Sequence, residues 1–234
     1  MTDSSLLSSL LDALQLLLLG DGKLWSIILV SFKVSSLAML VAALPAVICG
    51  FLLAYMRFPG RRLLISLFNT LLAVPAVVVG LTFYILLSRH GPLGDWKLLF
   101  TQTAMVLGQI ALCFPIMVAM SHAAFQAIDL RAWETARTIG AGTVQAFMMI
   151  VSEARYAILG AFVAGFGRII AEVGASMMLG GNILHYTRNI PTAIALETSK
   201  GELSQGIALG IVLVTLSFLL VSVLHYFQGR GQIQ

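Results

Sequence analysis

Residues 25–56 read WSIILVSFKVSSLAMLVAALPAVICGFLLAYM, an apolar run with one charged residue, Lys33. A helix needs about 20 predominantly apolar residues to cross the hydrocarbon core of a bilayer, so this run exceeds the requirement. We expect the excess length to be accommodated by tilting, by a kink near Pro45, or by projection from the membrane with Lys33 reaching the interface. The stretch predicts a transmembrane helix.

The rest of the chain has the same character. Hydrophobic residues make up 59% of the sequence and charged residues 10%, with a mean hydropathy of +0.97, whereas soluble domains carry roughly 25% charged residues. Further apolar runs long enough to cross a membrane are Leu63 to about Leu87, about Thr101 to Met120, Ile158 to about Leu179, and about Gln205 to Phe227. The sequence therefore predicts an all-α transmembrane protein with five spans, its membrane domain covering residues 24–228.

The N-terminal segment, residues 1–23, has a different pattern. Polar residues recur at helical spacing and leucines fill the opposite side, which predicts an amphipathic helix lying in the membrane interface. A sixth span over residues 6–19 is the alternative, but that run is short and contains Asp12 and Gln15. No Lys or Arg precedes Lys23, which argues against a signal peptide.

Basic residues between the runs indicate the orientation of the chain. Arg57, Arg61 and Arg62 form a compact cluster after the first run, and such clusters favour the cytoplasmic side. We therefore expect the N-terminus outside, the C-terminus inside with residues 229–234 as a cytoplasmic tail, and the polar segment around Glu134 in the cytoplasm.

That polar segment, residues 133–142, reads WETARTIGAG. Glu134 is followed by the small residue Ala136 and, six positions on, by Gly140, so a helix here would offer a smooth face with an acidic start to a partner's groove. The alternative is an ordinary solvated loop helix.

The same segment resembles the EAA motif of ABC importer permeases, with matching positions at Glu134, Ala136, Gly140 and Ile150. The sequence departs from the motif at Thr135 and at residues 152–155, which read SEAR instead of containing the Leu-Pro ending. The resemblance implies that a cytoplasmic loop of about 122–157 contains a coupling helix that docks on the ATPase subunit. The residues that it assigns to ATPase coupling are Glu134, Ala136, Arg137, Gly140 and Ala141.

Three other segments resemble permeases for molybdate, tungstate and sulfate. They are residues 72–80 (LAVPAVVVG) with 91–94 (GPLG), residues 167–176 (GRIIAEVGAS) with 180–182 (GGN), and residues 186–201, which are most similar to the tungstate-type branch. The resemblance implies a type I importer in which two identical permease subunits work with cytoplasmic ATP-binding subunits. An extracytoplasmic binding protein would deliver tungstate, with molybdate as the second choice.

The fourth apolar run contains an ionisable pair, Arg168 and Glu172. Residues four apart share a helix face, so the two charges can neutralise each other within the membrane. Two interpretations stay open: the pair lines or closes the anion route between two subunits, or it fixes helix packing. With Ser176 and Asn182, the pair makes up the candidate translocation path; ordinary helix capping explains Asn182 nearly as well.

Catalytic motifs are absent from the sequence. It contains no phosphate-binding Gly-x-x-x-x-Gly-Lys-Ser/Thr loop, no His-Glu-x-x-His and no Gly-x-Ser-x-Gly. Histidines and cysteines lack metal-ligand spacing, and the net charge of +4 is too small to indicate nucleic-acid binding. We expect a transport subunit that is not itself an enzyme, has no cofactor or metal, and contacts membrane lipid.

Two other functional classes remain open. A secondary transporter would work without ATPases, but such proteins usually carry several intramembrane acids, and Glu172 is the only acid well inside a span. A membrane scaffold would not need Glu134 or Gly140 in particular.

Overall fold

The computed structural model describes residues 22–231, which form helices joined by turns and loops, without β-strands in this range. The predicted amphipathic segment lies outside the described residues, apart from Gly22 and Lys23, which begin the first helix. The expected all-α class is confirmed. In chain order the elements are α2 (Gly22–Tyr55), α3 (Arg61–Leu71), α4 (Ala76–Leu87), η1 (Gly94–Trp96), α5 (Gln102–Gln126), α6 (Leu130–Thr138), α7 (Thr143–Glu153), α8 (Arg155–Ile170), α9 (Gly174–Gly180), α10 (Ile190–Lys200) and α11 (Leu203–Gly231).

Two of these helices, α2 and α5, are each long and apolar enough to cross a membrane alone. Each has an internal proline, Pro45 in α2 and Pro115 in α5, and each helix continues beyond it. At about 1.5 Å per residue, the 34 residues of α2 span about 50 Å. The expected excess length of this span over a bilayer core is therefore real.

The runs predicted as single spans at 63–87 and 158–179 are both broken in the structure. The first divides into α3 and α4 because Pro75 takes an extended conformation and cannot donate to a helical hydrogen bond. The second divides at residues 171–173 between α8 and α9, and α8 is bent by 72° against the preceding helix α7. Taken together as bent pairs, α3 with α4 and α7 with α8 are also long and apolar enough for a span or a re-entrant loop, and α11 contains the apolar section Gln205–Leu219.

The chain divides into two compact units, which are described separately. Unit 1 contains the residues up to Ala38 together with Pro75–Ala111 and Gly167–Leu219, and unit 2 contains Met39–Val74, Leu112–Phe166 and the residues from Leu220 onward. Helices α2, α5, α8 and α11 contribute residues to both units. The predicted 24–228 membrane domain is thus built from two separately packed parts.

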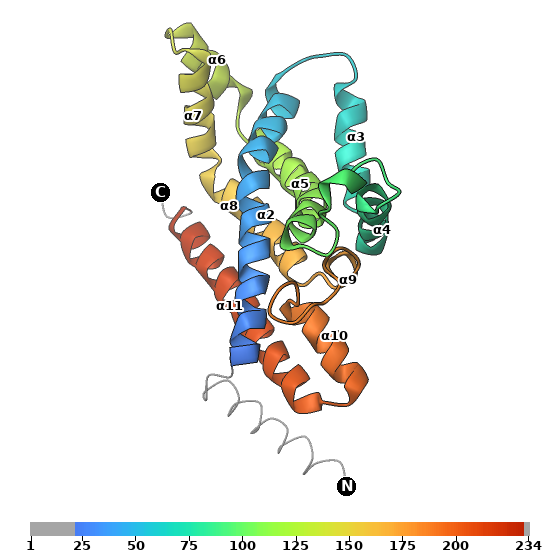
Figure 1. Ribbon diagram of the computed structural model, residues 1–234. Coiled ribbons are helices and arrows are strands. Elements are labelled where there is room, and N and C mark those ends of the chain that lie inside the picture. Colours follow the sequence, from blue (N-terminus) through green and yellow to red (C-terminus); the bar gives the residue numbers. More distant parts are fainter. Residues whose placement is uncertain (1–21, 232–234) are drawn as a thin grey trace. The chain divides into compact units, whose positions relative to one another are not determined.

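Unit 1 is organised around α9, which packs closely against α4 (Figure 1). A Cβ atom placed on Gly80 of α4 would lie only 2.8 Å from the Cα of Ala175 in α9. A Cβ on Gly180 of α9 would lie 2.7 Å from the sulfur of Met105 in α5. Small residues permit such close approach, which is how helices associate in lipid.

Unit 2 is organised around the aromatic ring of Phe51, near the end of α2. Its centroid lies 4.9 Å from that of Tyr55, 5.6 Å from Phe125 of α5, 5.3 Å from Trp133 of α6 and 4.8 Å from Phe147 of α7. Edge-to-face aromatic pairs each add about 0.5–1.5 kcal/mol beyond the area that they bury. This cluster therefore holds the short helices α6 and α7 against α2 and α5.

We predict that Gly80→Ala destabilises the protein by about 1–3 kcal/mol, because the new methyl group meets backbone that cannot move aside cheaply. Gly167→Ala is the matched control, since a Cβ there has no heavy atom within 4 Å. Thermal unfolding in mild detergent should show a lowered melting temperature for Gly80→Ala alone. Equal shifts in both variants would contradict the close packing of α4 on α9.

Candidate functional site

The polar segment singled out in the sequence forms α6, whose start differs from the prediction. The helix begins at Leu130 and is capped by Asp129, whose Oδ1 accepts a hydrogen bond of 2.9 Å from the backbone N–H of Arg131. Glu134 lies within the helix, so the acidic start is Asp129. An Asp directly before a helical run is a known start signal, which the sequence analysis had overlooked.

Gly140 ends this helix and does not lie on its face. It has a positive φ of 94°, its N–H donates to the carbonyl of Arg137 at 3.2 Å, and the N–H of Ala141 donates to the carbonyl of Ala136 at 3.0 Å. These bonds define a Schellman motif, in which glycine is favoured because side chains rarely adopt the left-handed conformation. A Cβ at Gly140 would meet no atom within 4 Å, so the reason for glycine here is backbone conformation.

Arg137 fixes the turn from α6 into α7. Its Nη1 donates to the carbonyl of Ala141 at 3.0 Å and contacts Oγ1 of Thr143 at 3.2 Å. Ala136 is buried, and Ala141 is half-buried. Of the predicted coupling residues, Ala136, Arg137, Gly140 and Ala141 therefore shape this turn.

Glu134 has a different environment from these four residues. Its side chain is exposed and makes no hydrogen bond or ion pair within residues 22–231. Close to it in sequence, Ile139 is 80% exposed and Val144 is 73% exposed. The sequence analysis missed these apolar side chains, although both flank the Gly140–Gly142 turn. Exposed apolar residues around a free carboxylate are typical of a docking surface.

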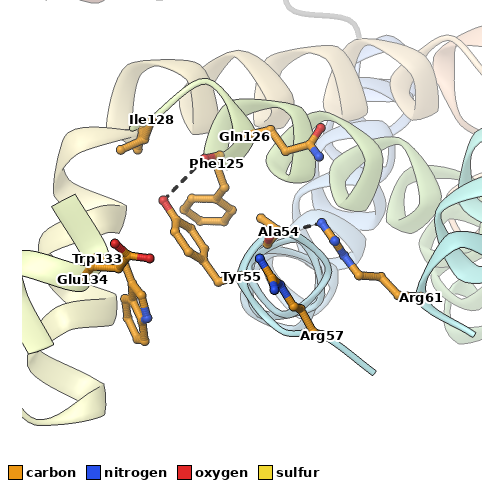
Figure 2. Close-up of a pocket in the computed structure, with 9 residues that line it drawn as sticks. All are labelled: Ala54, Tyr55, Arg57, Arg61, Phe125, Gln126, Ile128, Trp133 and Glu134. Atoms are coloured by element: carbon orange, nitrogen blue, oxygen red, sulfur yellow. Dashed lines mark hydrogen bonds between the residues drawn. The ribbon is translucent and has the colours of Figure 1, made fainter. Parts of the chain in front are cut away.

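A hollow of about 800 Å³ lies beside α6 in unit 2 (Figure 2). Figure 2 shows Trp133 and Glu134 on one side of it and Arg57 and Arg61 on the other. Arg61 is held in place because its Nε donates to the carbonyl of Leu53 at 2.5 Å and its Nη2 to that of Ala54 at 3.2 Å, both at the end of α2. The full lining is Ala54, Tyr55, Arg57, Arg61, Phe125, Gln126, Ile128, Trp133 and Glu134.

In unit 1, the predicted pair Arg168 and Glu172 is formed. Nη1 of Arg168 lies 2.7 Å from Oε2 of Glu172. The other carboxylate oxygen, Oε1, accepts a hydrogen bond of 3.2 Å from the backbone N–H of Ala175 at the start of α9. Glu172 is buried, whereas the side chain of Arg168 is 40% exposed. Glu172 follows the end of α8, so this pair bridges a helix break and does not lie along one continuous helix.

The other two predicted path residues lie apart from this pair. Ser176 is buried on α9, and its hydroxyl has no hydrogen-bond partner within residues 22–231. Asn182 follows α9 with a positive φ of 52°, and its Nδ2 donates to the carbonyl of Thr192 at 3.4 Å. No hydrogen bond in the described part of the chain joins either residue to Arg168 or Glu172. Gly181, and not Asn182, is the residue that caps the end of α9.

Thr187 and Arg188 lie between α9 and α10, and their side chains donate to nearby backbone carbonyls. Oγ1 of Thr187 donates to the carbonyl of Gly180 at 2.5 Å, and Nη2 of Arg188 donates to the carbonyl of Asn182 at 3.2 Å. These groups order the connection between α9 and α10. The residues from 22 to 231 contain no group of three or more metal-ligating side chains that could hold an ion.

The environment of the ion pair predicts unequal effects of removing its two charges. Arg168→Gln should destabilise the protein by about 1–3 kcal/mol or more, because it leaves the buried Glu172 carboxylate without its charged donor. Glu172→Gln should cost less, since an amide oxygen can still accept from Ala175 and the Arg168 side chain is partly exposed. Thermal unfolding of the two variants measures the difference. A larger loss for Glu172→Gln would contradict this order.

Comparison with known proteins supplies independent information. The family described as "Binding-protein-dependent transport system inner membrane component" matches residues 46–231. The tungstate uptake system permease protein of Peptoclostridium acidaminophilum is 37% identical over 92% of this chain and 95% of its own length. The molybdenum transport system permease protein of Escherichia coli K12 is 34% identical, covering 76% of this chain and 82% of its own. Among solved structures, a bacterial ABC transporter for import of the acidic polysaccharide alginate matches with a TM-score of 0.74 at 17% identity, covering 92% and 82% of the two chains.

Proposed function

Because the chain belongs to the family of binding-protein-dependent transport system inner membrane components, we propose that it is the permease subunit of an ATP-driven tungstate importer. One observation carries the choice of substrate, which is the similarity to a tungstate permease over nearly the full length of both proteins. Residues 186–201, which resemble the tungstate-type branch in sequence, support the same substrate.

Molybdate is the second candidate substrate. The molybdenum permease is similar over a smaller share of this chain, which favours tungstate. Both substrates are tetrahedral dianions, so one permease route can serve both. Substrate choice then rests mainly with the external binding protein, since a route that held its cargo tightly would not release it.

Family membership also bears on the mechanism of energy supply. Members act with separate ATP-binding and substrate-binding subunits, which disfavours a secondary transporter or a scaffold. We propose a homodimer of this chain in the cell membrane, with the N-terminus outside and the C-terminus in the cytoplasm. The cluster of Arg57, Arg61 and Arg62 supports that orientation.

The α6–α7 turn is the proposed ATPase-docking element. Its support is the rigid Schellman turn, in which Arg137 and Gly140 fix the backbone, together with the side chains that it leaves exposed. Glu134 would bind a cation of the ATPase subunit, and Ile139 and Val144 would enter an apolar part of its cleft. The Phe51 cluster would transmit the resulting force to α2 and α5, because it packs α6 and α7 onto both helices.

The proposed translocation path includes Arg168, Glu172, Ser176 and Asn182. For Arg168, the support is that the buried carboxylate of Glu172 engages only one nitrogen of its guanidinium, while the side chain stays partly exposed. The remaining donors can face an anion. Ser176 contributes a buried hydroxyl without a hydrogen-bond partner among the described residues. The Nδ2 of Asn182 donates to the carbonyl of Thr192 in α10, so Asn182 has the weaker claim.

The substrate assignment predicts a change in metal uptake. Cells that lack this chain should accumulate less tungsten at low external tungstate, and should recover only when the chain and its partner subunits are both present. Element-specific mass spectrometry of cells measures this, with molybdenum recorded in parallel. Unchanged tungsten and molybdenum together with a loss of sulfate uptake would overturn the substrate while leaving the permease assignment intact.

The docking assignment predicts that ATPase binding and transport can be impaired without loss of folding. Glu134→Lys should reduce co-purification of the ATPase subunit and lower transport, because it reverses an exposed charge without removing any contact within residues 22–231. Glu202→Lys is the matched control, since Glu202 is also exposed but belongs to unit 1. Melting temperatures of both variants should stay near that of the unaltered protein. Normal ATPase retention by Glu134→Lys would show that α6 does not dock through this residue.

A further inference from the structure

Helix α3 and the turn before it present an arrangement that neither the coupling element nor the transport path uses. Not one residue of α3 is buried, although six of its eleven residues are leucine, isoleucine or phenylalanine. Leu63, Leu67 and Leu71 are four residues apart and all exposed, so they form one apolar stripe along the helix. At its start Leu63 is 74% exposed.

Cationic side chains gather where this stripe begins. A second hollow of about 480 Å³ is lined by Arg57, Phe58, Gly60, Arg61, Arg62 and Leu63. Arg57 and Arg61 line both this hollow and the larger one beside α6. The smaller hollow has no acidic residue in its lining, whereas Glu134 lines the larger one. An anion therefore fits the smaller hollow better.

Two of these arginines are free to bind a ligand. Arg61 is engaged with the carbonyls of Leu53 and Ala54, which leaves it as a fixed cation at the wall of the hollow. The guanidinium groups of Arg57 and Arg62 make no hydrogen bond or ion pair within the described residues. Guanidinium groups recognise phosphate through two parallel hydrogen bonds, more specifically than ammonium groups do.

We propose that the α2–α3 turn and α3 together bind one anionic diacyl phospholipid. The phosphate occupies the hollow between Arg57, Arg61 and Arg62, and an acyl chain lies along the stripe of Leu63, Leu67 and Leu71. A soluble anion would have no use for the apolar stripe, and a protein surface would need to match both a phosphate-sized hollow and a lipid-facing helix. Anionic lipids attract juxtamembrane arginines at about 1 kcal/mol per residue near the membrane surface.

The proposal rests on the proposed function in one respect, which is the side of the membrane on which the lipid site lies. The larger hollow brings Arg57 and Arg61 beside Trp133 and Glu134, so the lipid site shares the side of the membrane on which α6 meets the ATPase. In the proposed orientation this is the cytoplasmic leaflet, whose surface is negatively charged.

Native mass spectrometry of the full chain in complex with its partner subunits tests the headgroup site. The complex in mild detergent receives equal amounts of phosphatidylglycerol and phosphatidylcholine with identical acyl chains. The unaltered complex should retain the anionic lipid preferentially, and the double variant Arg57→Gln/Arg62→Gln should weaken that preference about thirtyfold, as expected from two arginines at about 1 kcal/mol each. Arg89→Gln, an exposed arginine of unit 1, is the control and should retain the preference.

A second variant tests the acyl-chain site. Leu63→Gln/Leu67→Gln should lower retention of both lipids alike and leave the headgroup preference unchanged. Addition of inorganic phosphate should not displace phosphatidylglycerol from the unaltered complex, because free phosphate lacks the acyl-chain contact.

Several outcomes would overturn the proposal. An undiminished preference for phosphatidylglycerol in the arginine variant would contradict the headgroup site. Displacement of the lipid by inorganic phosphate would identify a simple anion site. Loss of the ATPase subunit with retained lipid would assign the arginines to the protein partner. Dissociation of two permease copies in the leucine variant would identify the stripe as an interface between copies. Because lipid retention is measured separately from tungsten uptake, failure here with normal uptake leaves the proposed function intact.

Discussion

Within lipid, apolar helix faces gain little by leaving one apolar surrounding for another, so helices associate where their backbones approach closely. That constraint governs unit 1. Gly80, Gly174 and Gly180 bring α9 against α4 and α5, and at each of these positions a Cβ would lie within 2.8 Å of a neighbouring atom. The position of α9 in turn places Ser176 and the N–H of Ala175, which Glu172 binds. Close packing of small residues therefore builds the surroundings of the candidate path.

Unit 2 positions its candidate site through aromatic contacts instead of through close approach of small residues. Helix α6 is too short and too polar to be held by lipid, and it depends on the aromatic contact of Trp133 with Phe51. Its surface is set by the backbone of the Gly140 turn and the hydrogen bonds of Arg137. A docking element of this kind needs rigidity, because force from a partner would otherwise be absorbed by the turn.

Charged groups have three distinct uses in this chain. Glu172 neutralises Arg168 and orders the start of α9, so its role includes packing whatever its part in transport. Arg61 binds backbone carbonyls at the end of α2, where unpaired acceptors would otherwise remain, and Arg137 binds a backbone carbonyl in the turn between α6 and α7. Glu134, Arg57 and Arg62 make no such contacts in the described part of the chain, and they are the groups for which we propose external partners.

The sequence by itself determined the all-α membrane class, the transport family and the pairing of Arg168 with Glu172, because hydropathy, motif spacing and i,i+4 separation are all local properties. It could not determine that the runs at 63–87 and 158–179 are broken, since an apolarity count does not register helix continuity. It also could not show that Gly140 lies in the turn that ends α6 and not on the helix face, because a positive φ depends on how the turn closes. Only the tertiary structure decided the Phe51 cluster, because it brings together residues that are far apart in the chain. It also decided the exposure of Ile139 and Val144 and the grouping of Arg57, Arg61 and Arg62 around one hollow, because it gives neighbouring side chains different surroundings.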